Sequence, residues 1–397
     1  MKILFYSILS SYTFQRVGGA ETSIRLLAEK LAERGHKVYY LTLDNSGKKL
    51  YRKLKIQGVT VILFSTIKYR AKSKIINRLI LICNRMLYRY IINIVIGLQK
   101  MDIVYAFYEL KILTELINLR KKSPSYYKFK IVMRMAGIKW WEDIKLNNKF
   151  KSIYNNVFNN VDYINYISNG VKRLSFEKAK EMNISYTEKN FVADIGVDID
   201  QNNYSWQGVS RTNPFQLLMA TRFSSYQKRQ DILINAVNII DGKIPLMVVL
   251  IGDGPEKDKY INLIESYQLQ DTIKVYPFLE QIKTWELMTK SDLLCHPCDY
   301  EGLSKIIIES MSIGLPVLSS NVLAPSDYII DGYNGFLADN TAACWAEKII
   351  EIYNTKLQLN DVSKRAKEFV QHNYDATKNI LTYEKAFKSV IDGTEAS

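Results

Sequence analysis

A chain of 397 residues is too long for one ordinary hydrophobic core, so its length predicts two or three domains. With 47% hydrophobic and 24% charged residues, the composition is that of a globular protein and excludes wholesale disorder. The net charge of +14 favours an anionic partner, which could be nucleic acid, anionic lipid or a phosphorylated substrate.

The chain begins with an apolar run that could be mistaken for a signal peptide. Residues 1–9 are too few for one and no cleavage site follows, so we interpret them as a buried first strand of a cytoplasmic protein. Four scattered cysteines also indicate a reducing compartment rather than a disulfide framework. In the first half the pattern predicts a helix over 20–34 that ends at Gly35, and strands over 2–9, 37–43, 59–64, 102–107, 129–135 and 162–168.

Residues 68–100 thread basic side chains through apolar ones in an amphipathic pattern. Arginine recurs too often there for a membrane-spanning helix. We expect the segment to lie on an anionic membrane surface; the alternative is a surface helix whose apolar face packs on its own domain. No zinc-finger, RNP-like or basic-region pattern supports a nucleic-acid partner. The basic residues are Lys68, Arg70, Lys72, Lys74, Arg78, Arg85 and Arg89.

Strands and helices alternate more regularly in the second half, after a polar linker at 200–213. Such alternation is typical of a parallel-sheet α/β architecture. We therefore expect two doubly wound domains that face each other across a cleft, with ligands at the carboxyl ends of the strands. The predicted strands are 215–220, 246–251, 273–276, 292–296 and 316–319, and the predicted helices are 229–240, 256–268, 282–290 and 304–313.

Two carboxylates, Glu301 and Glu309, stand eight positions apart after one of these strands. If the chain between them is largely helical, they are separated by roughly 12 Å. That span suits a nucleotide-sugar, with one acid on the sugar hydroxyls, the other on the ribose hydroxyls and a diphosphate between them. The helix start near Leu303 and Ser304 would offer free N–H groups to the diphosphate. The alternative is that Glu301 caps a helix and Glu309 is solvated.

This segment resembles the Glu-x7-Glu signature of retaining glycosyltransferases with the GT-B fold, family 4. Gly302, Gly314, Pro316 and the turn at 331–335 also stand where that family has them. The resemblance implies two Rossmann-like domains, an acceptor-side domain at 1–200 and a nucleotide-sugar domain at 201–374, with a helix at 375–397 that returns to the first domain.

The resemblance also implies an activity. We expect retaining transfer of a sugar from a UDP-sugar or GDP-sugar, without a metal or other cofactor. The expected acceptor is a lipid-linked saccharide in bacterial capsule, O-antigen or exopolysaccharide assembly, which would place the protein peripherally on the inner face of the cell membrane. Two other classes stay open: an epimerase-like enzyme that binds nucleotide-sugars, and a non-catalytic protein that binds nucleotide-sugars or glycans.

Arg222 and Lys228 follow a predicted strand and precede a helix. Two cations beside a helix N-terminus would hold a diphosphate and stabilise the charge on the departing nucleotide. Their Arg-x5-Lys spacing matches the donor-phosphate residues of the resembled family. That family also places a Gly-Gly-x-Glu loop, here with Gly19, against the donor phosphate.

Further donor residues are implied after the next two strands. Gly252 and Gly254 would allow a tight turn and close approach of the nucleoside. Phe278 and Leu279 align with the segment whose backbone reads the base in the resembled family. With these residues, Glu301 is expected on the sugar and Glu309 on the ribose.

The sequence departs from the family in the first domain, where no histidine follows the fourth or fifth strand. Arg134 and Glu109 are the polar residues nearby that could replace it. The motif Cys295-His-Pro-Cys298 has the spacing of a redox or metal site, but no second pair lies at zinc-finger spacing, which favours structural packing. His296 is a further candidate for lining the donor pocket.

Overall fold

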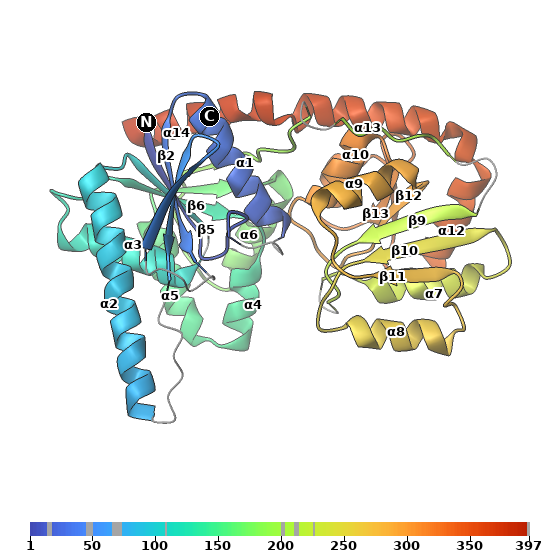
Figure 1. Ribbon diagram of the computed structural model, residues 1–397, viewed down its shortest axis with the longest axis horizontal. Coiled ribbons are helices and arrows are strands. Elements are labelled where there is room, and N and C mark those ends of the chain that lie inside the picture. The colour runs from blue at the N-terminus through green and yellow to red at the C-terminus, as the bar shows by residue number, and fades with distance from the viewer. Residues whose placement is uncertain are drawn as a thin grey trace. The chain divides into compact units, whose positions relative to one another are not determined.

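The structure is a computed structural model that describes residues 1–13, 18–44, 51–65, 74–107, 109–199, 203–209, 214–224 and 227–394. The chain divides into two compact units (Figure 1). The first contains Met1–Ile195 and Ala376–Ser397, and the second contains Gly196–Asp375. The predicted linker at 200–213 and the basic residues Lys68, Arg70 and Lys72 lie wholly or partly outside the described residues.

The first unit is built on a sheet with the strand order β3-β4-β2-β1-β5-β6-β7-β8. All neighbouring strands are parallel except β3 and β4, which form an antiparallel hairpin. The sequence-based prediction missed β3, because half of its residues are basic, most are exposed and it forms the edge of the sheet. The strands are β1 (Lys2–Tyr6), β2 (Lys37–Leu43), β3 (Tyr51–Ile56), β4 (Val59–Phe64), β5 (Ile103–Phe107), β6 (Lys130–Met135), β7 (Tyr163–Tyr166) and β8 (Asn190–Val192).

Helices cover this sheet. On one face the first and last helices of the chain pack together over β1, burying Phe5, Leu27 and Phe387 in one core. The last helix therefore belongs to the first unit although 180 residues of the second unit precede it. The helices are α1 (Gly19–Glu33), α2 (Lys74–Gln99), α3 (Leu110–Lys122), α4 (Lys139–Leu146), α5 (Lys149–Asn160), α6 (Asn169–Glu181) and α14 (Ala376–Asp392).

Helix α2 carries the predicted amphipathic segment, and its amino-terminal end extends past the rest of the first unit in Figure 1. Its carboxyl-terminal half packs on the unit through four buried side chains, Ile91, Ile92, Val95 and Ile96. Packing on the chain's own domain, the alternative to a membrane, thus holds for this half. Other apolar side chains recur three or four residues apart along one face and are exposed: Ile75, Leu79, Cys83, Met86, Tyr90, Ile94 and Leu98. None of the described helices is long and apolar enough to cross a bilayer.

The second unit is a parallel sheet with the order β11-β10-β9-β12-β13-β14. Successive residues of its central strand face opposite ways, as a pleated strand requires. Leu217 packs in the core under α7, α8 and α12, and Leu218 packs in the core under α10 and α13. The strands are β9 (Phe215–Ala220), β10 (Leu246–Ile251), β11 (Ile273–Tyr276), β12 (Leu293–His296), β13 (Val317–Ser320) and β14 (Phe336–Ala338).

The helices of the second unit follow the predicted alternation as far as α10, and the prediction did not extend to the elements after β13. The helices are α7 (Gln230–Ile240), α8 (Lys257–Ser266), α9 (Gln281–Lys290), α10 (Lys305–Ile313), α11 (Pro325–Tyr328), α12 (Ala342–Asn354) and α13 (Leu359–Asn373). The unit closes where its two ends meet. Gly196 has a φ of +74°, and a Cβ added to it would lie 2.0 Å from the carbonyl oxygen of Tyr374.

Candidate active site

The candidate site of the second unit lies where two loops pair at the carboxyl ends of β9 and β12. The backbone at Lys228 bridges that at Cys298 in antiparallel fashion. On either side, the N–H of Asp299 donates to Gln227 (3.1 Å) and the N–H of Arg229 donates to Pro297 (3.2 Å). This short ladder places Lys228 beside Glu301, 73 residues later in the chain.

Four side chains converge there. The Lys228 ammonium forms an ion pair with Oε2 of Glu301. His296, at the end of β12, holds its Nε2 3.2 Å from Lys228 Nζ and 3.2 Å from the same Glu301 oxygen. Ser304 Oγ also lies 3.2 Å from that ring nitrogen. The other oxygen of Glu301 accepts from Gln227 Nε2 at 3.5 Å. Glu301 therefore neither caps a helix nor stands in solvent.

Burial and charge oppose each other in this cluster. Burial alone would raise the pKa of Glu301, but Lys228 and His296 outweigh it and hold the pKa below its usual range. Burial and the Lys228 cation lower the pKa of His296 to about 4. At neutral pH the cluster is thus an ammonium and a carboxylate that share a neutral imidazole.

Glu309 is buried on α10, with 6% of its surface exposed, which excludes the solvated alternative. Its Oε1 accepts a 2.6 Å hydrogen bond from Gln281 Nε2 on α9. Burial raises the pKa of Glu309, and Lys305, Trp285 and Gln281 offset part of this effect. The carboxylate is held by neighbouring helices, and its expected contact with a ribose stays a prediction.

Arg222 differs from Lys228 in its surroundings. It lies just beyond the carboxyl end of β9 and is exposed. Its side chain makes no hydrogen bond or ion pair with any residue that the structure describes. Its carbonyl oxygen accepts from Gln230 Nε2 at 2.8 Å, which fixes the backbone from which the guanidinium projects. One of the two predicted phosphate-binding cations is therefore already engaged and the other is available.

Gly252 and Gly254 have a packing role that the sequence did not predict. A Cβ at Gly252 would lie 2.1 Å from the carbonyl oxygen of Thr221, and a Cβ at Gly254 would lie 2.1 Å from that of Phe223. The loops after β9 and β10 thus touch backbone to backbone next to Arg222. Phe278, half-buried, donates its N–H to Oδ2 of Asp253 at 3.2 Å.

The start of α10 also serves the cluster. Ser304 is the N-cap residue, but its hydroxyl makes no cap hydrogen bond and faces His296 instead. Leu303 and Leu279 are half-buried and pack against the core under α10. Their expected contacts with the donor stay predictions.

In the first unit, Gly19 opens α1 after the loop that follows β1. Glu109 precedes α3 at the carboxyl end of β5, and its Oε1 accepts the N–H of Ile8 at 3.3 Å. Burial and the neighbouring Glu21 carboxylate raise the pKa of Glu109 to about 7. A carboxyl group that titrates near neutrality therefore lies where relatives of the resembled family carry a histidine.

The other candidate for that histidine, Arg134, was wrongly placed by the sequence. It is 1% exposed and bonds internally to Asp194 at 2.9 Å. Tyr105 and Tyr383 lie 3.4 and 3.5 Å from its Nη1. Arg134 therefore fixes α14 to the sheet from within and does not face a ligand.

Cys295 and Cys298 are both fully buried. Burial raises the pKa of both thiols, that of Cys298 to about 12, so they stay protonated and unreactive. Structural packing is thus the interpretation that the burial supports. Across the described residues no three His, Cys, Asp or Glu side chains gather as a metal site would need.

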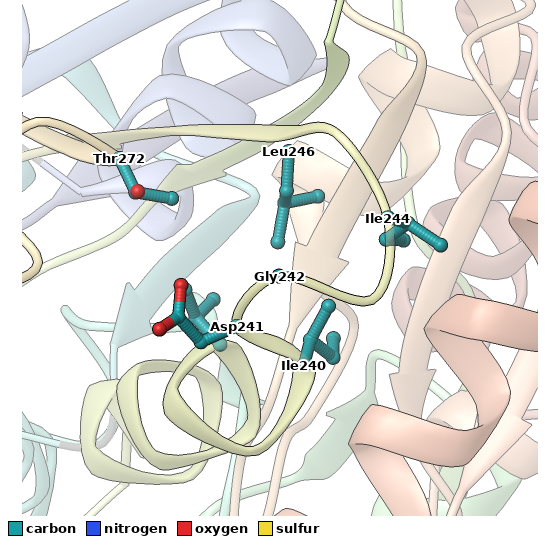
Figure 2. Close-up of a pocket in the computed structure, with 7 residues that line it drawn as sticks. Ile240, Asp241, Gly242, Ile244, Leu246 and Thr272 are labelled. Atoms are coloured by element: carbon teal, nitrogen blue, oxygen red, sulfur yellow. The ribbon is translucent and has the colours of Figure 1, made fainter.

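The hollow in Figure 2 is not the candidate site. It lies between the end of α7 and the start of β10. The amino ends of the strands are on this side of the sheet, whereas Lys228 and Glu301 lie beyond the carboxyl ends. One exposed carboxylate, that of Asp241, is among the residues that line it: Val237, Ile240, Asp241, Gly242, Ile244, Leu246 and Thr272.

Comparison with known proteins finds similarity in both sequence and fold. The family "Glycosyl transferases group 1" matches residues 200–369, which is most of the second unit. Over this stretch the second unit is similar to the group 1 glycosyl transferases.

The similarity to individual proteins is low in sequence and covers from about half of this chain to nearly all of it. N-acetyl-alpha-D-glucosaminyl L-malate synthase of Bacillus anthracis is 22% identical over 95% of this chain and 96% of its own. A putative colanic acid biosynthesis glycosyltransferase, WcaL of Escherichia coli, is 24% identical over 47% of this chain and 48% of its own. Anabaena HepE, solved in complex with UDP-glucose, superposes with a TM-score of 0.73 at 18% identity, covering 98% and 100% of the two chains. The predicted GT-B fold is confirmed.

Proposed function

We propose that this protein transfers a sugar from a nucleotide-diphospho-sugar to a saccharide acceptor, with retention of configuration and without a metal ion. The main support for this proposal is the cluster of side chains at the end of β12. It places a buried carboxylate, a cation and a hydrogen-bonding imidazole within 3.2 Å of one another, and the exposed Arg222 stands after the neighbouring strand.

Each residue has a part in this reaction. Arg222 and Lys228 neutralise the diphosphate as it leaves with the nucleotide, which is where negative charge builds in the transition state. Glu301 accepts hydrogen bonds from hydroxyls of the transferred sugar, and Glu309 from those of the ribose. In a front-face mechanism the leaving phosphate itself takes the acceptor's proton, so no protein base is obligatory.

UDP-glucose is the first donor to test, because HepE, which shares the fold, was solved in complex with UDP-glucose. Purified protein would be screened by thermal shift against UDP- and GDP-sugars, since a ligand that binds only the folded state raises its apparent stability. Arg222→Ala is the matched control, because this exposed side chain contributes no described contact to the fold. Stabilisation of the wild type and not of this variant supports the assignment.

Product analysis separates the proposed enzyme from the two other classes. A transferase gives free nucleoside diphosphate together with a glycosylated acceptor. An epimerase-like enzyme changes the sugar while it stays on the nucleotide, and a non-catalytic protein stabilises with the donor but gives no product. Either of the last two results contradicts transfer.

For the acceptor we propose a lipid-linked saccharide, reached from the inner face of the cell membrane. The support is the exposed apolar face of α2, which runs from Ile75 to Leu98 beside basic residues. Apolar side chains would enter the headgroup region while each basic residue adds up to about 1 kcal/mol near an anionic surface. Arg89 contributes least, because Glu115 already holds it through two bonds of 2.8 and 2.9 Å.

Co-sedimentation with vesicles tests this membrane proposal. Wild type should bind anionic vesicles, release as salt shortens the Debye length, and leave neutral vesicles unbound. Leu79→Asp with Met86→Asp changes only exposed positions and should abolish binding. Leu357→Asp, at an equally exposed apolar position on the second unit, is the control and should bind as wild type does. A wild type that stays in the supernatant at low salt contradicts the proposal.

A further inference from the structure

His296 lies in the centre of the cluster, yet the proposed reaction gives it no part. It is 1% exposed, and its Nε2 is within 3.2 Å of Lys228, Glu301 and Ser304. Its other ring nitrogen, Nδ1, is buried and has no hydrogen-bond partner among the residues that the structure describes. A buried imidazole with one crowded and one unpartnered nitrogen calls for an explanation.

The contacts of Nε2 favour one tautomer of the neutral ring. Lys228 has only N–H donors, so it suits Nε2 as an acceptor with the ring proton on Nδ1. Among the described residues no group receives a proton from Nδ1. Glu301 is then paired with the ammonium, and it gains an N–H from Nε2, 3.2 Å away, when the ring takes up a second proton. This arrangement suits the site only while Lys228 stays beside Glu301.

We propose that His296 is a positioning residue that replaces Lys228 on Glu301 when a nucleotide diphosphate draws the ammonium away. On donor binding, Nε2 takes one proton from the solvent, and the resulting N–H donates to Oε2 of Glu301. No bond other than this N–H forms. The inference rests on the proposed function, because it needs the diphosphate to engage Lys228.

The electrostatics of the surroundings favour the exchange. Burial and Lys228 lower the pKa of His296, while Glu301 raises it. Withdrawing the cation removes one of the two lowering causes and leaves the carboxylate at 3.2 Å. The remaining groups do not compensate: burial keeps Cys298 and Tyr328 protonated, and Asp299 is bound to Arg229 at 2.7 Å.

The sign of the pH dependence follows. The free protein binds this proton only below about pH 4, whereas the donor complex binds it at higher pH. Between the two pKa values, donor binding takes up a proton, so affinity increases as the pH falls. The increase is at most about tenfold per pH unit, because one proton is exchanged.

Calorimetry with UDP-glucose tests the proposal, in buffers of different ionisation enthalpy at pH 5.5 to 7.5. Both phosphates of UDP-glucose are diesters, so the ligand itself does not titrate there. Wild type should take up a fraction of a proton that increases toward low pH. His296→Gln, whose amide N–H can donate to Glu301 at every pH, should bind with no proton uptake.

Nuclear magnetic resonance gives a second measurement that needs no variant. The chain has three histidines, so the ring nitrogens of His296 can be resolved in labelled protein. UDP-glucose should shift them from the neutral Nδ1–H form toward imidazolium. Binding without proton uptake, uptake that persists in His296→Gln, or an unchanged His296 spectrum each overturns this inference and leaves the proposed function intact. If no nucleotide-sugar binds the wild type, both are overturned.

Discussion

The carboxyl ends of the two sheets carry opposite electrostatics. In the second unit, the ends of β9 and β12 carry an exposed cation, Arg222, and a buried pair, Lys228 with Glu301. In the first unit, Glu109 follows β5 and Glu21 lies in the first turn of α1, and burial together with the Glu21 charge raises the pKa of Glu109. Burial also raises the pKa of Glu21, which the Arg134 charge partly offsets, and Arg134 itself is paired with Asp194.

This difference separates two chemistries. Cations at a strand end suit a diphosphate, whereas a carboxyl group that is half neutral near pH 7 suits hydroxyl groups, to which it can donate as well as accept. Under the proposed function, we infer that the second unit binds the anionic part of a donor and that the first unit binds uncharged sugar groups. Substitution of single charged residues tests this difference between the two units.

The largest effect should come from the two cations. We expect Arg222→Ala and Lys228→Ala each to lower the turnover about 100- to 1000-fold, since each loses a charge-assisted contact to the leaving diphosphate. Stability distinguishes them. Lys228→Ala leaves Glu301 buried without its cation and should lower the melting temperature at pH 7. Arg222→Ala changes an exposed position and should leave the melting temperature unchanged.

The stability effect of Lys228→Ala has a defined pH window. The folded pKa of Glu301 lies below its usual value, so the pair stabilises above the unfolded pKa of about 4.3 and loses this effect as the pH falls. The difference in melting temperature between variant and wild type should therefore begin to shrink as the pH falls below about 4.3. Turnover near the wild-type rate in either variant contradicts the phosphate assignment.

The next effect concerns stability alone. Arg134→Met removes the cation that pairs with the buried Asp194, which should cost about 3–5 kcal/mol of unfolding free energy. UDP-glucose binding to the folded variant should be unchanged, because the pair lies in the first unit. Arg134→Met combined with Asp194→Leu is the control and should recover most of the loss. If the Arg134→Met variant has normal stability but no activity, the structural role of Arg134 is contradicted and a role in the active site is supported.

The donor residues and Arg134 also show how much of the structure could be predicted from the sequence. Most of the strands follow from apolar runs, and the GT-B fold was implied by a family resemblance that rests on the spacing of Arg222, Lys228, Glu301 and Glu309. The sequence did not show which residues each side chain contacts in the folded protein. Arg134 is a charged residue in β6, but its partner Asp194 comes 60 residues later in the chain. Only the folded structure shows that the two residues form a pair.

The same limit explains His296 and the glycines. The sequence placed His296 between two cysteines, favoured structural packing of that motif and named His296 as a candidate for the donor pocket. It did not show that the ring contacts a lysine 68 residues earlier. Gly252 and Gly254 were read for a ligand, and the loop they touch belongs to another strand. Contacts between strand ends depend on the order of the strands in the sheet, which no local pattern gives.

A smaller effect should appear at Glu109. Its folded pKa, about 7, exceeds the unfolded value of about 4.3, so between these values the folded state binds the extra proton and stability falls as the pH rises. Glu109→Gln cannot ionise and should be more stable than wild type by about 1–3 kcal/mol at pH 8. The difference should vanish near pH 4. Melting curves over pH 4 to 9 measure it, and Glu115→Gln, which removes a half-buried carboxylate of α3 paired to Arg89, is the control.

The smallest expected effect is that of a chelator. If Arg222 and Lys228 balance the diphosphate, they occupy the role that Mg²⁺ has in metal-dependent transferases. Sugar transfer should then continue at an unchanged rate in excess EDTA, measured as release of nucleoside diphosphate, and added Mg²⁺ or Mn²⁺ should not raise it. The sensitive version uses Lys228→Ala, in which a divalent cation could replace the missing charge. Rescue of this variant by Mg²⁺ with no effect on wild type would locate the charge requirement at Lys228, whereas loss of wild-type activity in EDTA contradicts the metal-free mechanism.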